Sequence, residues 1–382
     1  MKVIASTLIY LVMAFNFIAC GNSEEEKPIE TGTKEVSSSP VDYKIEPFVE
    51  GLEIPWSIVF TSPERMLVAE RPGRIRVVEN GVLRQEPLKV FNDVVTGGEE
   101  GLMGLTLDPE YETNKLIYVS YAYEGNDGMT VKVVQYKDDG ASLSGEKIII
   151  DNLPARQYHA GCRLRFGPDG KLYITTGDAG ERHLAQETDN LYGKILRINP
   201  DGTVPDDNPY PGSPIWSIGH RNPQGIDWYP GTDVLYSTEH GPSGFDGPGG
   251  GDEVNVIVKG GNYGWPIVSH ENSKEGMIDP VLVFTPAEAP ASGMFYSGDL
   301  LPQFKNNFFF GSLRGRGIVR VEVNPDDPSK VTSYEKMSNI NYGRIRDITQ
   351  GPDGAIYFAT SNQDGRGNPA PGDDKIYRIT AK

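Results

Sequence analysis

The feature that most constrains the fold of this chain is a phrase that occurs twice almost unchanged. Residues 166–173 read FGPDGKLY and residues 350–357 read QGPDGAIY, each a tight turn followed by β-forming residues. Looser copies begin at four further places, so that the copies are spaced roughly 45 to 75 residues apart, the size of one supersecondary unit. These four copies begin at Phe60, Leu107, Trp228 and Leu301.

Six copies of a turn-and-strand unit predict an all-β chain folded as a six-bladed β-propeller. Between the copies lie short alternating runs typical of strands, such as those at 75–78, 131–134 and 318–321. A closed ring covers both faces of each blade and leaves few free strand edges. We expect residues 375–379 to close the ring by pairing with residues near 43–48. A β-sandwich, or several small β-domains, is the alternative.

The amino-terminal residues predict export. Met1 and Lys2 precede an apolar run from Val3 to Ala19, which is short for a membrane span and typical of a signal peptide. Cys20 follows in a sequence that resembles a bacterial lipobox and predicts a lipid anchor; an ordinary signal peptide cleaved nearby is the alternative. We therefore divide the chain into a signal peptide (1–19), an acidic and polar tether (20–41) and the propeller (42–382), and expect an extracytoplasmic protein, lipid-anchored at the periplasmic face or the cell surface.

Charge and cysteine content narrow the possible functions. The chain has 36 basic and 53 acidic residues and a net charge of −17, which argues against nucleic acid as a partner. Cys162 is the one cysteine that follows Cys20, so no disulfide can form within the exported chain. We interpret Cys162 as a small buried apolar residue.

One heptad indicates an anion-binding site. Residues 219–225 read GHRNPQG and place Arg221 and Asn222 between two glycines and just before a proline. A backbone restricted in this way can hold a guanidinium and an amide rigidly toward a ligand, and arginine suits carboxylates.

Further polar residues stand at the expected ends of strands. His159 precedes a strand and Asp178 follows the next one, so strand pairing can bring them together, and a carboxylate on one imidazole nitrogen makes the other a proton acceptor. Arg344 and Arg346 alternate, as they would on one side of a strand. Taken singly, each has a structural explanation: a hydrogen-bonding histidine, a turn aspartate and a solvated arginine face. Arg314 and Arg316 alternate in the same way.

Together these segments resemble the soluble quinoprotein glucose dehydrogenase and aldose sugar dehydrogenase family, six-bladed propellers that use pyrroloquinoline quinone (PQQ). The resemblance extends from about residue 52 to residue 377. Its most specific segments are 219–225 and 259–266 (KGGNYGWP), supported by 100–105, 159–164 and 343–347.

The resemblance implies a role for each matching residue. It makes His159 the general base and Asp178 the carboxylate that orients it. The residues that it implies for PQQ binding are Glu99, Arg221, Asn222, Arg314, Arg344 and Arg346. It implies an activating Ca²⁺ on the backbone oxygens of Gly241 and Pro242, and a structural Ca²⁺ at Glu253 and Tyr263.

Three positions depart from the family pattern. Glu99 stands where the sugar dehydrogenases have glutamine, Tyr158 where the glucose enzyme has aspartate, and Cys162 where glycine is common. A carboxylate beside an anionic cofactor is unfavourable unless it is protonated or turned toward a metal or an arginine.

The resemblance implies a calcium-assisted, PQQ-dependent enzyme that oxidises aldoses at the anomeric carbon to lactones and passes electrons to an external acceptor, the quinone pool or a cytochrome. The first alternative is a non-catalytic propeller that binds glycans or protein partners. The second is a calcium-dependent lactonase, which needs a central metal site rich in carboxylates.

Overall fold

The computed structural model describes residues 34–35 and 42–382. The predicted signal peptide and, apart from Lys34–Glu35, the predicted tether lie outside the described residues. No helix among the described residues is long and apolar enough to span a membrane. Their helical segments are short: α1 (Tyr111–Asn114) and two 3₁₀ turns, η1 (Arg182–Gln186) and η2 (Pro302–Phe304).

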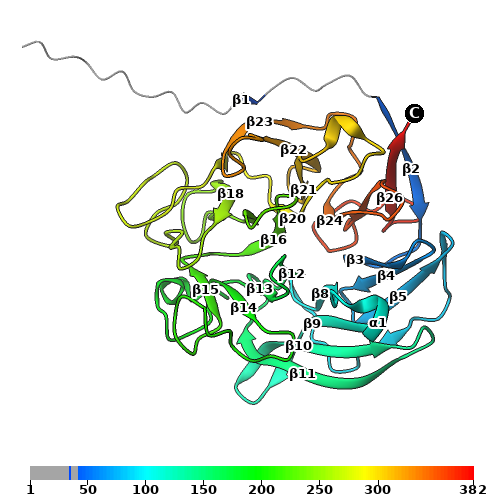
Figure 1. Cartoon of the computed structure of the whole chain (residues 1–382), viewed down its shortest axis with the longest axis horizontal. Coiled ribbons are helices and arrows are strands. Elements are labelled where there is room, and N and C mark those ends of the chain that lie inside the picture. Colours follow the sequence, from blue (N-terminus) through cyan, green and yellow to red (C-terminus); the bar gives the residue numbers. More distant parts are fainter. Residues whose placement is uncertain (1–33, 36–41) are drawn as a thin grey trace, which may run out of the picture. The chain divides into compact units, whose positions relative to one another are not determined.

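Six antiparallel sheets surround a common centre as the blades of a propeller, which confirms the predicted fold (Figure 1). Within each of the first three blades the strands follow chain order from the centre outward. The first blade has β3 (Pro55–Ser62), β4 (Arg65–Glu70) and β5 (Arg74–Glu79), and the short strands β6 (Val82–Leu83) and β7 (Lys89–Val90) both pair with β5. The second has β8 (Leu102–Leu107), β9 (Leu116–Gly125), β10 (Gly128–Asp138) and β11 (Leu143–Pro154), and the third has β12 (Leu164–Phe166), β13 (Leu172–Thr176), β14 (Lys194–Ile198) and β15 (Ile215–Ile218).

The last three blades follow the same order. Their strands are β16 (Pro223–Trp228), β17 (Leu235–Glu239), β18 (Asp252–Ile257) and β19 (Leu282–Phe284); β20 (Pro290–Phe295), β21 (Phe308–Ser312), β22 (Gly317–Val323) and β23 (Val331–Lys336), with β1 (Lys34–Glu35) parallel to β23; and β24 (Ile345–Gln350), β25 (Ile356–Thr360), β26 (Ile376–Ala381) and β2 (Tyr43–Val49).

The ring closes where the sequence predicts. Strand β2 forms the outer edge of the last blade and pairs antiparallel with β26, from Tyr43 opposite Ala381 to Val49 opposite Ile376. The first strand of the propeller and the last therefore share one sheet, so that unfolding either end exposes the edge of the other.

The repeated phrase marks the same place in every blade. Each of the six copies connects the innermost strand to the second strand, as the turn at 166–172 does between β12 and β13. The carboxyl ends of the six innermost strands consequently lie on one face of the ring and their amino ends on the other. Loops that enter the innermost strands therefore meet on the face away from the repeated turns.

Burial on both faces explains the strongly apolar inner strands. In β21, Phe308, Phe309 and Phe310 are all fully buried. Phe308 and Phe310 pack toward the fourth blade, where the ring centroids of Phe310 and Phe284 are 5.6 Å apart. Phe309 packs toward the sixth blade. Successive residues of one strand thus join two neighbouring blades.

One local prediction is wrong. The alternation of Arg314 and Arg316 suggests a strand, but residues 313–316 form the turn between β21 and β22. Gly315 interrupts the pair, and Arg316 adopts a left-handed backbone with φ 59°. Arg314 and Arg316 consequently face different cavities rather than one side of a strand.

Candidate active site

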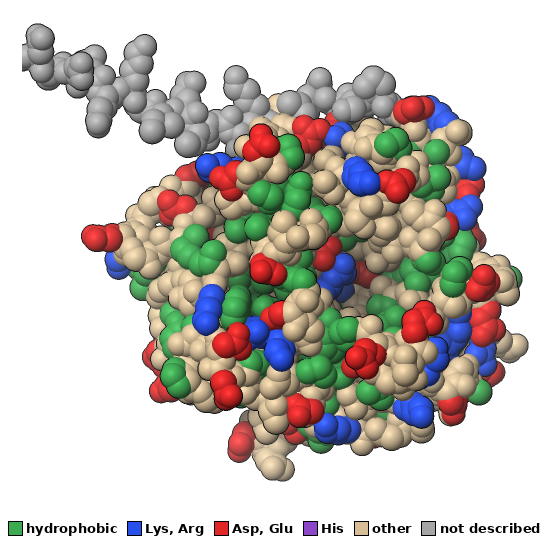
Figure 2. Space-filling view, viewed as in Figure 1, with side chains coloured by type: hydrophobic (Ala, Val, Ile, Leu, Met, Phe, Trp, Pro, Cys, Tyr) green, Lys and Arg blue, Asp and Glu red, His purple; other side chains and the backbone are tan. Residues whose placement is uncertain are grey.

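A cavity of about 640 Å³ lies where the loops entering the innermost strands converge. Eight of the residues predicted for the site line it, which places residues from six separate segments of the chain around one space. They are Glu99, His159, Arg221, Gly241, Pro242, Arg314, Arg344 and Arg346. The space-filling view shows the ring hollowed near its centre, with lysine or arginine side chains in the hollow (Figure 2).

His159 and Asp178 meet as the strand order predicts. His159 precedes β12, Asp178 follows the antiparallel β13, and His159 Nδ1 lies 2.7 Å from Asp178 Oδ1. Gly177 permits this approach, because a Cβ there would stand 1.9 Å from the carbonyl oxygen of His159. Since an ionised carboxylate can only accept hydrogen bonds, it holds the imidazole proton on Nδ1 and leaves Nε2 as the proton acceptor.

A tryptophan that sequence reasoning missed fixes the same carboxylate. Trp265 Nε1 donates to the second oxygen of Asp178 at 2.8 Å. The His159 backbone is held in the left-handed region, φ 55°, a conformation that costs a non-glycine residue about 1 kcal/mol or more and is typical of functional sites. His159 is 5% exposed and faces the cavity. The arrangement can therefore serve as a rigid, oriented base.

The cavity wall has the opposite charge to the chain as a whole. Five arginines line it, against two carboxylates, Glu99 and Asp252. In a protein with a net charge of −17, this local excess of positive charge favours an anionic ligand. The five are Arg221, Arg314, Arg344, Arg346 and Arg366.

Two of these arginines already have carboxylate partners behind the wall. Arg221 Nε lies 2.8 Å from Asp246 Oδ2, and Arg344 Nε lies 2.7 Å from Asp364 Oδ2. The pairs explain how these guanidinium groups are buried, because an unpaired buried charge is costly. They also leave less free charge for a ligand than the arginine count suggests.

Arg346 differs from the other buried arginines of the wall. Its Nη1 donates to Gln224 Oε1 at 3.0 Å, but its Nε has no hydrogen-bond partner among the described residues. Burial lowers the pKa of Arg346 to about 9, and nearby Asp364 offsets this effect only in part. A donor in this state is ready for an acceptor from the ligand.

Asn222 has a similar free donor. It is fully buried, and its Oδ1 accepts a hydrogen bond from Gln224 Nε2 at 3.0 Å, while its Nδ2 is without a partner in the described part of the chain. Arg346, Gln224 and Asn222 therefore form a chain of hydrogen bonds with an unsatisfied donor at each end. Buried donors of this kind are rare, and they fit a ligand rich in carboxylates and carbonyls.

Glu99, a carboxylate that would repel an anionic ligand, forms an ion pair with Arg366, a residue that the sequence did not indicate. Its Oε1 lies 2.7 Å from Nη1 of Arg366, and its Oε2 accepts the backbone N–H of His159 at 3.2 Å. Burial alone would raise the pKa of Glu99, but His240 and Arg366 lower it to about 2. The carboxylate is therefore ionised and turned toward an arginine.

The predicted activating calcium site is a braced turn on the cavity wall. Gly241 N donates to Asp252 Oδ1 at 2.8 Å, and the Pro242 carbonyl accepts a hydrogen bond from Gly250 N at 3.2 Å. Backbone carbonyls beside a carboxylate are suitable ligands for Ca²⁺.

Glu253 and Tyr263, predicted for a structural calcium, lie apart from the cavity wall. The Tyr263 hydroxyl donates to the Val256 carbonyl at 2.6 Å and accepts the Val258 N–H at 2.8 Å, so it is satisfied by the backbone. Glu253 stands directly opposite Glu239 in the β17–β18 pair, and burial and this second carboxylate raise its pKa to about 8. A cation would relieve that repulsion.

Cys162 is a free, buried cysteine three positions after His159. The side chain is 0% exposed, and burial raises the pKa of its thiol to about 12. The interpretation of Cys162 as a buried apolar residue is confirmed.

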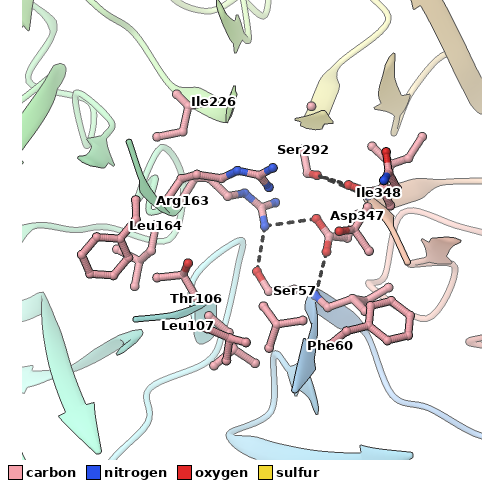
Figure 3. A pocket seen from close by; sticks show the side chains of 18 of the residues that line it. Ser57, Phe60, Thr106, Leu107, Arg163, Leu164, Ile226, Ser292, Asp347 and Ile348 are labelled. Carbon is pink, nitrogen blue, oxygen red and sulfur yellow. Dashed lines mark hydrogen bonds and ion pairs between the residues drawn. The ribbon is translucent and has the colours of Figure 1, made fainter. Parts of the chain in front are cut away.

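A second cavity, of about 510 Å³, lies along the centre of the ring among the innermost strands (Figure 3). Its charges are paired: the buried Arg163 lies 3.1 Å from Asp347 and donates to Ser57 Oγ at 2.7 Å. The partly exposed Arg165 lies 3.0 Å from Asp227. With its charges balanced, this cavity lacks the positive excess of the first.

Arg163 also supports the floor of the first cavity. Its guanidinium lies 4.0 Å from the ring of Trp56, and its Nε donates to the Gln224 carbonyl at 3.0 Å. Arg346 approaches the same Trp56 ring at 5.7 Å. The polar residues at the centre thus hold Gln224 and Arg346 in place from the other side.

Comparison with known proteins identifies the family. A model of the glucose/sorbosone dehydrogenase family matches residues 52–377. The chain belongs to this family. Membership confirms the resemblance drawn from the sequence and, with it, the prediction that the chain is an oxidoreductase. Among curated relatives, aldose sugar dehydrogenase YliI of Escherichia coli is 33% identical over 86% of this chain and 92% of its own length.

Solved structures of family members have the same fold. A Thermus thermophilus protein described as a putative oxidoreductase (glucose dehydrogenase) is 39% identical, with a TM-score of 0.80 over 88% of this chain and 99% of its own. The PQQ-bound aldose sugar dehydrogenase of Streptomyces coelicolor is 29% identical, with a TM-score of 0.79 over 90% of this chain and 100% of its own.

Proposed function

We propose that this protein is a PQQ-dependent, calcium-assisted dehydrogenase that oxidises aldoses at the anomeric carbon to lactones. The observation that supports it most is one cavity with an oriented base, His159, and a wall of five arginines. The family relatives include a PQQ-bound aldose sugar dehydrogenase, which agrees with a tricarboxylate quinone as the anionic ligand.

The proposal gives each residue a defined task. His159 Nε2 accepts the proton of the anomeric hydroxyl as the C1 hydrogen leaves as hydride, and the Asp178 carboxylate stabilises the resulting imidazolium. When bound, PQQ supplies the hydride acceptor. Arg344, Arg346 and Asn222 would hold its carboxylates and carbonyls, together with Arg221 and Arg314.

The carbonyls of Gly241 and Pro242 would hold the activating Ca²⁺, which would polarise the quinone carbonyl that accepts hydride. Glu253 and Tyr263 would contribute to a structural Ca²⁺. The hydrolase alternative needs a central cluster of acidic ligands, and the residues that the structure describes contain no group of three or more histidine, cysteine or acidic side chains placed to bind a metal. This favours the dehydrogenase.

We further propose that the enzyme acts outside the cytoplasm, anchored through a lipid on Cys20 and delivering electrons to the quinone pool or a cytochrome. The sequence of residues 1–20 supports this part of the proposal.

The function is tested by reconstitution. We expect the purified protein to show PQQ-dependent dye reduction with aldoses, saturable in PQQ and enhanced by Ca²⁺, because the cavity offers cationic and carbonyl ligands for both. Absorbance titration with PQQ measures binding separately from turnover. Tight PQQ binding without turnover on any aldose would leave a quinone-binding protein and refute the enzyme; no PQQ binding would favour the non-catalytic propeller.

The Glu99–Arg366 pair makes a second test. Arg366→Ala is expected to weaken PQQ binding about tenfold, because an ionised Glu99 would then stand unpaired beside an anionic ligand. Glu99→Gln/Arg366→Ala should recover most of the lost affinity, since it removes the repulsive charge as well. Equal losses in the single and double variants, measured by PQQ titration, would show that Arg366 acts independently of Glu99.

A further inference from the structure

An exposed aromatic side chain lies beside the base. Phe245 is 69% exposed, lines the cavity and belongs to the loop 243–251 between β17 and β18. Its ring centroid is 6.4 Å from that of His159, with the two planes 21° apart. Tyr158 stands edge-on to both rings, 4.9 Å from His159 and 5.9 Å from Phe245. An apolar ring left in water at a cavity mouth indicates a surface for a ligand.

The loop that presents Phe245 is anchored although it is rich in glycine. Asp246 Oδ2 pairs with Arg221 Nε at 2.8 Å, and Asp246 Oδ1 accepts the Ser243 N–H at 2.9 Å. The Asp246 carbonyl accepts a hydrogen bond from Arg182 Nη1 at 2.9 Å. These three contacts on the next residue restrain the loop beside Phe245, so the loop is preorganised to present the ring at the cavity.

We propose that Phe245 and Tyr158 form an aromatic wall that binds the C–H face of the substrate's pyranose ring and brings the anomeric hydroxyl to His159. This inference rests on the proposed function and adds two residues that position its substrate. They suit aldopyranoses that present an unbroken face of C–H groups, such as all-equatorial β-glucopyranose. The chemistry suits the geometry, because a phenyl ring offers a flat apolar surface, and the arginines of the cavity remain available to the anionic cofactor.

Phe245→Ala is the direct test. We expect the KM for glucose to rise about tenfold while kcat stays within about twofold, because the wall contributes binding and not proton transfer. PQQ affinity, measured by absorbance titration, should stay within about twofold of wild type. Phe245→Tyr should retain the wild-type KM, since the ring remains. Val82→Ala, which truncates a side chain of similar exposure, 67%, on the outer strand β6, should change neither constant. An unchanged KM in Phe245→Ala would refute the aromatic wall.

A binding measurement separates this inference from the enzyme proposal. Saturation-transfer NMR on the PQQ- and Ca²⁺-loaded protein with β-methyl glucoside, which cannot be oxidised at C1 through a free hydroxyl, should show transfer to the sugar C–H protons in wild type. The transfer should be lost in Phe245→Ala and kept in Val82→Ala. If wild type shows this contact but no turnover on any aldose, the wall stands and the dehydrogenase proposal fails. If turnover is normal and the transfer is absent or persists in Phe245→Ala, the wall is wrong.

Discussion

Replacing His159 by alanine is expected to lower kcat by about three orders of magnitude and to leave PQQ affinity within about twofold, since general bases contribute about 10²- to 10⁴-fold. The expectation follows from the geometry: Nδ1 lies 2.7 Å from Asp178, and the imidazole ring faces the cavity apart from the five arginines that we expect to hold the cofactor. Turnover at saturating sugar and absorbance titration with PQQ measure the two effects separately. Retained turnover would remove His159 from the mechanism.

Asp178→Asn provides the matched control for this prediction. Asp178 uses two acceptor oxygens, one for His159 Nδ1 and one for Trp265 Nε1. Asparagine has one acceptor oxygen, so one of the two donors loses its partner and the imidazole loses its carboxylate. We expect kcat to fall about a hundredfold, less than for His159→Ala, because the base remains but is less well oriented. A kcat equal to wild type would show that orientation by Asp178 is unimportant.

The sequence predicts those parts of the molecule that depend on local order. The repeated turn occurs at the same strand connection in every blade, so counting copies counts blades. His159 and Asp178 could be paired because they flank two consecutive antiparallel strands, whose ends must meet. The closing pair of β2 and β26 was predictable for a related reason, since a ring needs a partner for its last strand.

The remaining features of the site join segments that are remote in sequence. Glu99 and Arg366 are separated by 267 positions and come from loops of different blades. Trp265 reaches Asp178 from 87 positions away, and its segment was recognised without a role for the indole. No local pattern encodes such contacts, because they depend on how the loops fold over the ring. The strand predicted from the alternation of Arg314 and Arg316 was wrong for the opposite reason. A local pattern was present, but Gly315 lies between the two arginines and the segment forms a turn.

Arg346→Met is expected to weaken PQQ binding by at least about a hundredfold without lowering the melting temperature of the PQQ-free protein. Removing one partner of a buried charged contact with a ligand costs about 2 to 5 kcal/mol or more. The stability of the PQQ-free protein depends on a different balance of free energies. Arg346 is 5% exposed, its Nε has no partner in the described residues, and burial pulls its pKa down to about 9. Exchanging such a charge for an apolar side chain of similar length removes a desolvation penalty.

Arg320→Met distinguishes an arginine that holds a ligand from one that holds the fold. Arg320 is also buried, but its Nη1 lies 2.8 Å from Glu335 in the fifth blade, and it is absent from the cavity wall. Breaking this buried pair should destabilise the protein by about 3 to 5 kcal/mol and leave the PQQ affinity of the folded protein unchanged. The two variants should therefore give opposite patterns in thermal melting and PQQ titration. If Arg346→Met instead melts as early as Arg320→Met and binds PQQ normally once folded, Arg346 is a structural residue, and its unsatisfied donor must be explained by something other than the cofactor.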